Sequence, residues 1–447
     1  MTVLLASLTL ASCIHYQAGS LDPGTTAADF SRRRLDDPSL RPHLVAAGST
    51  RARTTWPLDR WTLRDLQAVA LHYHPEIAVS KAKAASAIAA ITTADTPPNP
   101  TLSLTPEYGS NPGAGVSPWI LGFSPDITIE TAGKRQARTK QARHQANSAV
   151  LAISDTSWLV MSAVRAALVD LEASRQRLTL LEEQQRNDDE LIAALTARVS
   201  AGESPHSELA LYQSQRGRNA IDLADARSRV DSGVAKLADA MGMPASSMQR
   251  QSLDWPDFNR LPAPPAEARL RKSALLERSD LLAALEDYAA SDSSLRLEIA
   301  RQYPDLHVNP GYTFDQGQSK WALGIGMTLP VDRNLGPIRE AIAKRDEASA
   351  IFQRVQIGIS GELSQALASY RSDLSRLRDV QSLLAVQEKE AGNALELSRQ
   401  GEGTRIPVLE ARGTILQAKL AVIDAIAQAN QSLGKLQDSA RLTLEPS

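Results

Sequence analysis

The chain has 447 residues, with 49 Lys and Arg against 51 Asp and Glu, a single cysteine and an aromatic content of 4%. The formal net charge of −2 gives no electrostatic basis for nucleic-acid binding, one cysteine excludes a disulfide within the chain, and no uninterrupted apolar run reaches the roughly 18 residues of a membrane-spanning helix. So few aromatic side chains, with abundant Ala, Leu, Arg and Gln, favour an elongated molecule built from long helices.

The chain begins MTVLLASLTLASC, an apolar stretch of about nine residues, which is typical of a signal-peptide core and too short to span a bilayer. Its end, Leu10-Ala-Ser-Cys13, resembles the cleavage box of bacterial lipoproteins. This resemblance implies removal of residues 1–12 and attachment of a lipid to Cys13. Ile14 stands where an aspartate would retain such a lipoprotein in the inner membrane, so the resemblance implies an anchor in the outer membrane.

Residues 13–57 are rich in Arg, Ser, Gly and Pro and show no sustained apolar period. This composition predicts an extended tether behind the lipid anchor. Its Arg32-Arg33-Arg34 run is interpreted as part of a solvated linker, with binding to anionic lipid as the alternative.

Internal repetition determines the predicted domain organisation. Asn99-Pro-Thr-Leu102 recurs as Tyr303-Pro-Asp-Leu306 at an offset of 204, and Trp119-Ile-Leu-Gly-Phe123 recurs as Trp321-Ala-Leu-Gly-Ile325 at an offset of 202. We therefore predict two repeats and a Pro-rich linker. The repeats are expected at 58–241 and 266–436, the linker at 242–265 and a C-terminal tail at 437–447.

Both repeats have the same succession of a helix, two strands, a very long helix, a Gly turn and a return helix. Apolar residues at three- and four-residue spacing predict that the long helices form antiparallel coiled-coil hairpins. About 67 residues at 1.5 Å each give a length of about 100 Å. The helices are expected at 60–95, 134–200, 206–241, 266–302, 338–399 and 406–436.

The four strands alternate large apolar residues with small or polar ones, as in Trp119-Ile-Leu-Gly-Phe-Ser. About ten residues with this period span a bilayer when tilted, and Trp119 and Trp321 at strand ends suit the aromatic girdle of a membrane interface. A half-buried soluble sheet is the alternative, but four strands leave the apolar face uncovered. The strands are expected at 101–108, 119–130, 305–314 and 321–331.

Four strands cannot close a barrel, and an open edge is unfavourable in lipid, so closure requires several copies of the chain. Two copies give eight strands with little room for a water-filled lumen, and three give twelve. The predicted fold class is mainly α with a small membrane β part, in which long hairpins form the bulk of each chain.

This order of elements resembles the TolC-like outer membrane efflux family over about residues 58–440. The segment from Trp61 to Ile77 resembles the opening helix of the family, and Ile129-Glu-Thr-Ala-Gly-Lys-Arg135 is similar to the CzcC-like branch that includes metal exporters. Gly401-Glu-Gly-Thr-Arg-Ile-Pro-Val-Leu-Glu-Ala411 resembles a turn and return helix at the periplasmic tip.

The resemblance implies a homotrimer in which the hairpins form an α-helical barrel across the periplasm and the strands form a 12-stranded barrel in the outer membrane. It implies that tip turns at Gly202, Gly401 and Gly403 dock a periplasmic adaptor and an inner-membrane pump.

In the family, acidic residues after the second tip turn surround the closed aperture. The matching positions are Pro407 and Glu410, and Glu410 alone keeps the carboxylate. Three copies of Glu410 would repel one another and favour cations; a solvated helix carboxylate is the alternative.

No catalytic group, cofactor or metal site is predicted. His72 and His74 are two residues apart and point in different directions on a helix, and Gly401-Glu-Gly403 lacks the longer pattern of a phosphate loop. The favoured function is a passive export duct rather than an enzyme. The alternatives are a periplasmic coiled-coil adaptor or scaffold and a type I protein-secretion duct, and metal cations, small organic toxins and proteins remain open as cargo.

Overall fold

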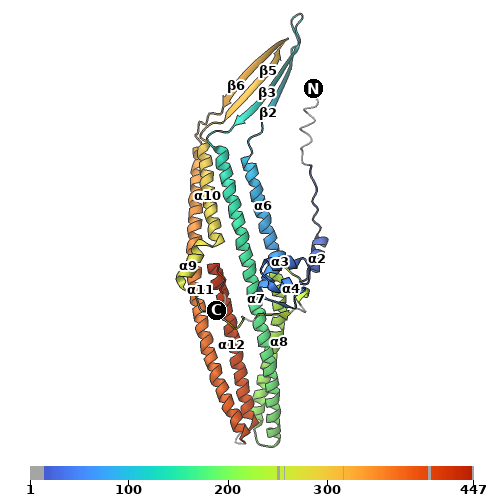
Figure 1. Ribbon diagram of the computed structural model, residues 1–447, viewed down its shortest axis with the longest axis vertical. Coiled ribbons are helices and arrows are strands. Elements are labelled where there is room, and N and C mark those ends of the chain that lie inside the picture. Colours follow the sequence, from blue (N-terminus) through green and yellow to red (C-terminus); the bar gives the residue numbers. More distant parts are fainter. Residues whose placement is uncertain (1–14, 249–251, 256, 316, 401–403, 445–447) are drawn as a thin grey trace.

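The computed structural model describes residues 15–248, 252–255, 257–315, 317–400 and 404–444. The predicted signal peptide at 1–12, Cys13, Gly401 and Gly403 lie outside these described residues. The molecule is elongated, with one sheet at one end, long helices along most of its length and a group of short helices beside the middle (Figure 1). A mainly helical fold with a few antiparallel strands is therefore confirmed.

The two long hairpins dominate the structure (Figure 1). Each outbound helix pairs with its own return helix, and α7 also contacts α12, so the two hairpins meet along these helices. Gly202 lies in the turn between the helices of the first hairpin at a φ of 74°, a conformation that costs glycine little. The hairpins consist of α7 (Lys134–Ser200), α8 (His206–Ala240), α11 (Leu335–Arg399) and α12 (Arg405–Ala440).

The opening helix of each repeat, expected as one element, is divided in two. His74 is extended (ψ 126°) because the ring of Pro75 disfavours a helical conformation in the residue before it. Farther along, Arg278 is likewise extended between the two helices of the second repeat. The four helices are α5 (Leu63–Tyr73), α6 (Pro75–Asp95), α9 (Glu267–Leu276) and α10 (Ser279–Ala300). Both α6 and α10 run beside α7 on the sheet side of the molecule (Figure 1).

The four-stranded sheet is antiparallel, with the order β2-β3-β5-β6, so β2 and β6 are its edges. Its strands are β2 (Thr101–Tyr108), β3 (Trp119–Ile129), β5 (Leu306–Asp315) and β6 (Gln318–Met327). The last strand begins and ends earlier than expected, and Pro330 lies outside it. The register places Pro125 opposite Pro310. The β3–β5 ladder has a gap at this point, because neither proline has an N–H to donate.

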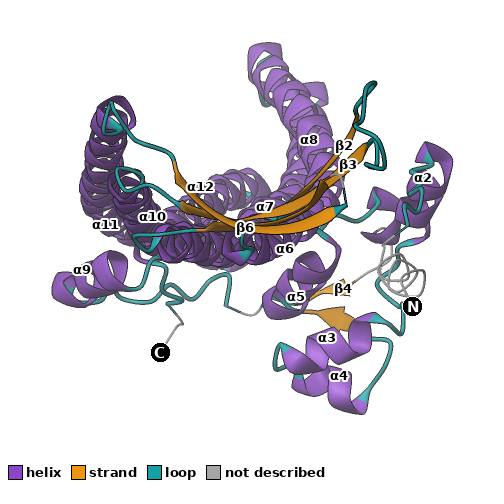
Figure 2. Cartoon of the chain, turned by 90° about the horizontal axis from the view of Figure 1, so that it is seen from above, coloured by secondary structure: helices purple, strands orange, loops and turns teal. Residues whose placement is uncertain are grey.

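The segment expected as an extended tether is folded, which corrects that prediction. It forms α2 (Pro23–Arg32), α3 (Leu40–Ala46) and α4 (Thr50–Thr54), which lie to one side of the long helices (Figure 2). The reason is burial of a small apolar set whose spacing the sequence pattern did not reveal: Leu35, Leu40, Leu44 and Ala52.

Nor is Arg33 a solvated linker residue. It is half-buried, and its Nη1 donates hydrogen bonds to the carbonyl oxygens of Tyr73 (3.1 Å) and Gly242 (2.6 Å), where α5 and α8 end. Unpaired carbonyls at a helix C-terminus favour a cation in this position. The arginine therefore ties the N-terminal segment to two helix ends.

The inter-repeat linker is also ordered where it is described. A short parallel pair joins β1 (Arg60–Trp61) to β4 (Ser252–Leu253), and Phe258 is buried near α7 and α12. Within the described residues, α7 contains one stretch long and apolar enough by composition to cross a membrane, contrary to the expectation of none; only 11% of that stretch is buried. A single helix that meets this criterion of length and composition is weak evidence for a span.

Candidate functional site

The first candidate site is the helical end of the molecule, opposite the sheet. An apolar cluster joins the two hairpins there, with side chains from α7, α8 and α12 packed together. Burial of such side chains is worth about 1.5–3 kcal/mol each relative to exposure, so the two hairpins are held together at this end. The buried members of the cluster are Leu191, Leu195, Leu209, Ile406 and Leu409.

Glu410 lies beside this cluster on α12 and is half-buried. Its carboxylate accepts a hydrogen bond from the Tyr212 hydroxyl of α8, so it connects the second hairpin to the first. Burial, together with the hydrogen bond to Glu410, raises the pKa of Tyr212 to about 12. At neutral pH the phenol is therefore a stable donor to the carboxylate.

A second set of contacts joins α12 to α7 along the same stretch. Arg405 pairs with Glu190 at 2.7 Å, Arg412 pairs with Glu183 at 3.0 Å, and Asn187 Nδ2 donates to the Leu409 carbonyl at 3.0 Å. The Asn187 Oδ1 atom is buried and has no hydrogen-bond partner among the described residues. These partners are more than 200 residues apart, so no spacing in the sequence reveals them.

Two other predicted tip residues have local structural explanations. Pro407 belongs to the first turn of α12, where its missing N–H removes no helical hydrogen bond. Gly202 has no atom within 4 Å of the position that a Cβ would take, so the left-handed backbone rather than crowding favours glycine there. Their roles at an aperture or docking surface remain predictions.

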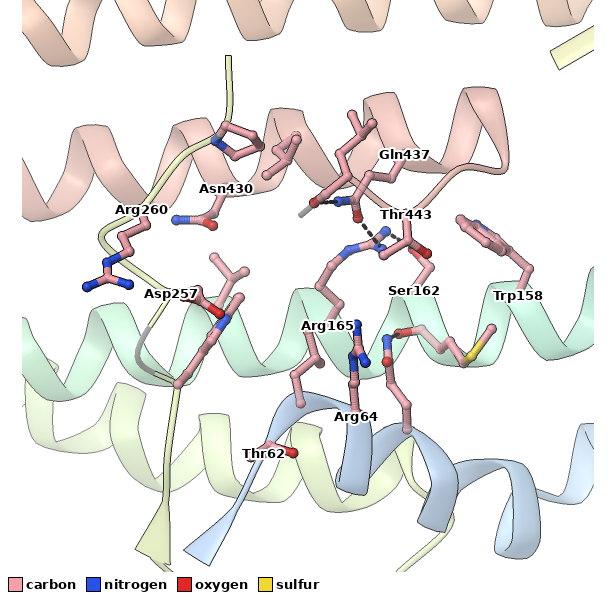
Figure 3. A pocket seen from close by; sticks show the side chains of 18 of the residues that line it. Thr62, Arg64, Trp158, Ser162, Arg165, Asp257, Arg260, Asn430, Gln437 and Thr443 are labelled. Atoms are coloured by element: carbon pink, nitrogen blue, oxygen red, sulfur yellow. Dashed lines mark hydrogen bonds between the residues drawn. The ribbon is translucent and has the colours of Figure 1, made fainter. Parts of the chain in front are cut away.

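Midway along the molecule, a pocket of about 620 Å³ lies between α5, α7, α12 and the linker (Figure 3). Arg165 crosses from α7 to α12, where it donates to Gln437 Oε1 (2.7 Å), Asp438 Oδ1 (2.6 Å) and the Gly434 carbonyl (3.1 Å). Trp158 Nε1 donates to the same carboxylate at 2.8 Å. The network fixes the contact between the two hairpins near the C-terminal end of α12.

The Ile129–Arg135 motif lies where β3 joins α7. Lys134 is buried, and its Nζ donates to the Tyr303 carbonyl and to Asp305 Oδ1, both at 2.7 Å. Just beyond the motif, Arg138 binds both carboxylate oxygens of Glu130 and also the Ala94 carbonyl. The basic residues of this segment therefore hold the sheet on the helices, which gives the motif a structural role.

The second candidate site is the sheet itself, whose apolar face is not covered by any of the described residues. Trp321 is 83% exposed and Leu323 is 68% exposed, values far from those of a protein core. Each predicted girdle tryptophan contacts a tyrosine of the neighbouring strand, at ring-centroid distances of 5.0 Å for Trp119 with Tyr108 and 4.8 Å for Trp321 with Tyr312. The two tyrosines were not predicted; their place in the repeated strands is the signal that identifies them.

No group of three or more His, Cys, Asp or Glu residues that could hold a metal is found in the part of the chain that the structure describes. His72 stacks on His43 at 4.1 Å, and burial together with this neighbour lowers the pKa of His72. His74 instead caps α6 by accepting a hydrogen bond from the Glu76 amide. The two histidines thus have separate structural roles.

Comparison with known proteins places these features in a family. The chain matches the family described as outer membrane efflux protein over residues 66–243 and 270–440. It is 24% identical over 314 residues to the cobalt-zinc-cadmium resistance protein CzcC of Cupriavidus metallidurans, covering 69% of this chain and 73% of that protein. It is 22% identical over 275 residues to the outer membrane efflux protein BepC of Brucella suis, covering 58% of each.

The fold is also similar to that of the outer membrane protein VceC of Vibrio cholerae, with a TM-score of 0.69 and 17% identity over 86% of this chain and 97% of that one. The chain belongs to the outer membrane efflux protein family. It is therefore an outer membrane efflux duct and not an enzyme, which confirms the favoured function over the adaptor and scaffold alternatives.

Proposed function

We propose that three copies of the chain form the duct. Their sheets pair edge to edge, β6 of one copy with β2 of the next, in a 12-stranded transmembrane barrel. The hairpins continue it as an α-helical barrel across the periplasm. The uncovered apolar face of the sheet is the observation that carries this proposal, because lipid is the environment that such a face requires and two unpaired edges do not persist in lipid. The tryptophan–tyrosine pairs then form part of the interfacial girdle.

The helical end opposite the sheet is the proposed periplasmic tip. Turns at Gly202, Gly401 and Gly403 would meet a periplasmic adaptor, which connects the duct to an inner-membrane pump. Three copies of Glu410 near the axis would form a cation-favouring aperture, and the Tyr212 bond would hold it closed. The support is that Glu410 already joins the two hairpins at this end.

We propose divalent metal cations as the cargo class. The support is the similarity to a cobalt-zinc-cadmium resistance protein over about two thirds of the chain. Energy for export comes from the pump, so the duct needs a continuous water-filled path rather than a catalytic site. Attachment of lipid to Cys13 would add a second hold on the outer membrane.

The assembly is tested by purifying the full chain from outer membranes in detergent and measuring its mass by native mass spectrometry. A trimer is expected; a monomer or dimer at the same concentration would contradict the proposal. In planar bilayers the trimer should conduct ions, and Glu410→Gln should reduce its cation selectivity. Unchanged selectivity would remove Glu410 from the aperture.

Lipidation has its own test, because the modification is covalent. Cells fed a labelled fatty acid should incorporate the label into the wild-type protein and not into Cys13→Ala. The variant should still assemble, since the strands and long helices that form the proposed duct are far along the chain from residue 13. Label in Cys13→Ala would refute the anchor.

A further inference from the structure

The polar face of the sheet carries a histidine and a carboxylate that the sequence keeps 181 positions apart. His307 lies on β5 and Asp126 on β3, and the His307 Nδ1 atom lies 3.2 Å from each oxygen of Asp126. Thr128 pairs with His307 across the strands, and its Oγ1 lies 3.4 Å from the same nitrogen. Within the described residues, the ring therefore makes its polar contacts through Nδ1.

The carboxylate is itself held in place. With its amide turned to suit both neighbours, Asn309 donates to Asp126 Oδ1 at 2.6 Å and to the Val308 carbonyl at 3.2 Å. Asp126 thus has partners that orient it toward the histidine. This part of the ladder is the one interrupted at Pro125, so side chains rather than backbone hydrogen bonds connect the strands there.

The other flank of the histidine is open. Gly326 is the partner of His307 on β6, and Gly324 is the partner of Asn309, so no side chain on that strand covers either residue. The His307 side chain remains 32% exposed and that of Asp126 36% exposed. The ring is therefore accessible from the flank that faces β6.

This arrangement has a recognised chemistry. A carboxylate that accepts the Nδ1 proton fixes the imidazole as the tautomer whose Nε2 lone pair is free to bind a metal, and it makes that nitrogen a better donor. Imidazole suits Zn²⁺ and similar transition-metal ions, whereas Mg²⁺ prefers oxygen ligands. One imidazole per chain binds weakly, which suits an ion in transit, since conduction requires that ions leave as well as enter.

We propose that His307, oriented by Asp126, is a transit site for divalent transition-metal cations on the inner wall of the β-barrel. The inference rests on the proposed barrel, in which the polar face of the sheet lines the lumen. Three such sites would surround the path, one from each chain. Asn309 acts through Asp126 as a positioning residue.

Zn²⁺ is the probe for the first test, with Mg²⁺ as the hard-cation control. Isothermal titration of the purified full chain should show a Zn²⁺ site that Asp126→Asn weakens by about 10- to 100-fold, the range typical when a partner of a metal-binding histidine is removed. His307→Gln should lose the site. The matched control is His144→Gln, because His144 forms a comparable pair with Glu286 at 2.7 Å between α7 and α10, away from the sheet.

Single-channel recording supplies the second readout. Zn²⁺ should lower the conductance of wild type and His144→Gln, leave His307→Gln unaffected, and Mg²⁺ should lower none of them. If His307→Gln binds Zn²⁺ and responds to it as wild type does, the site is refuted while the barrel stands. If no channels form but Zn²⁺ binding still depends on His307 and Asp126, the barrel fails and the metal site stands.

Discussion

Helices α7 and α11 occupy equivalent places in the two repeats, and so do α8 and α12, but burial does not follow this equivalence. Buried residues extend along nearly all of α7, to Leu195, and along α12 from Ile406 to Ala440. In α11 the last buried residue is Leu377, and positions 378–399 are all exposed or half-buried. The well-buried helices are the two that contact each other, which leaves α8 and α11 as the outer helices of the chain.

The difference shows that a repeat fixes the order of elements but not their environment. Large apolar residues remain uncovered on the outer helices, among them Leu211, Ile221, Leu383 and Val386. A face of this kind is typical of a surface that a partner covers. In the proposed trimer α11 of one copy would meet α8 of the next, so the exposed helices would become buried by assembly.

The largest expected effect follows from charging this outer surface. Leu383 and Val386, 51% and 53% exposed, lie three residues apart on one face of α11. Leu383→Asp combined with Val386→Asp should abolish the trimer in native mass spectrometry, because burying two carboxylates without partners is prohibitive. Gln381→Asp, which adds a charge at an exposed polar position on the opposite side of α11, should leave the trimer intact. Persistence of the trimer in the double variant would exclude this stretch from the interface.

A smaller but still large effect is expected inside the chain, at the contact between α7 and α12. Arg165→Ala removes the ion-pair partner of Asp438, which is 30% exposed and keeps its hydrogen bonds from Trp158 and Ser162, and should lower the free energy of unfolding by about 1–3 kcal/mol. The control is Arg227→Ala, whose pair with Glu182 is exposed and worth about 0–1 kcal/mol. The loss of stability in each variant is measured by thermal unfolding, with the circular dichroism signal of the helices as the readout. Equal shifts for the two variants would contradict the special role of the inner contact.

The smallest effect concerns the bond between the hairpins at the tip. The pKa of Tyr212 is raised from about 10 to about 12. The stability that the protonated phenol contributes through its bond to Glu410 is therefore complete below pH 10 and is lost as the pH rises through 12. Alkaline titration of tyrosinate absorbance should show a component near pH 12 that is missing in Tyr212→Phe. In Glu410→Gln the same titration component should move to lower pH, because the carboxylate that accepts the phenol proton is gone. A tip tyrosine titrating near pH 10 in wild type would disprove the contact.

Sequence patterns predicted the long helices well because their evidence is local and repeated many times. The apolar spacing from Val164 to Leu181 is sustained over turn after turn, and the turn at Gly202 interrupts it. The strands were predicted for the same reason, since alternation near Trp119 and Trp321 is also local. The N-terminal segment was mispredicted because a few leucines, such as Leu40 and Leu44, carry too little periodic signal to outweigh a polar composition.

Candidate sites were predictable only in part. Glu410 was predicted from the family resemblance, but its partner Tyr212 belongs to the other repeat. His307 drew no attention as a metal ligand, because no second histidine and no cysteine stands near it in the sequence. Asp126 reaches it through the pairing of β5 with β3, a contact that depends on the fold.

By itself the sequence determined the repeated order of helices and strands, the length of the hairpins and the two faces of the sheet, because these depend on periodicity within single segments. Only the tertiary structure decided that α7 and α12 lie inside the chain while α8 and α11 lie outside. It alone brought Arg165 to Asp438 and His307 to Asp126. Contacts between distant segments depend on how the two repeats pack together, and neither repeat encodes that packing alone.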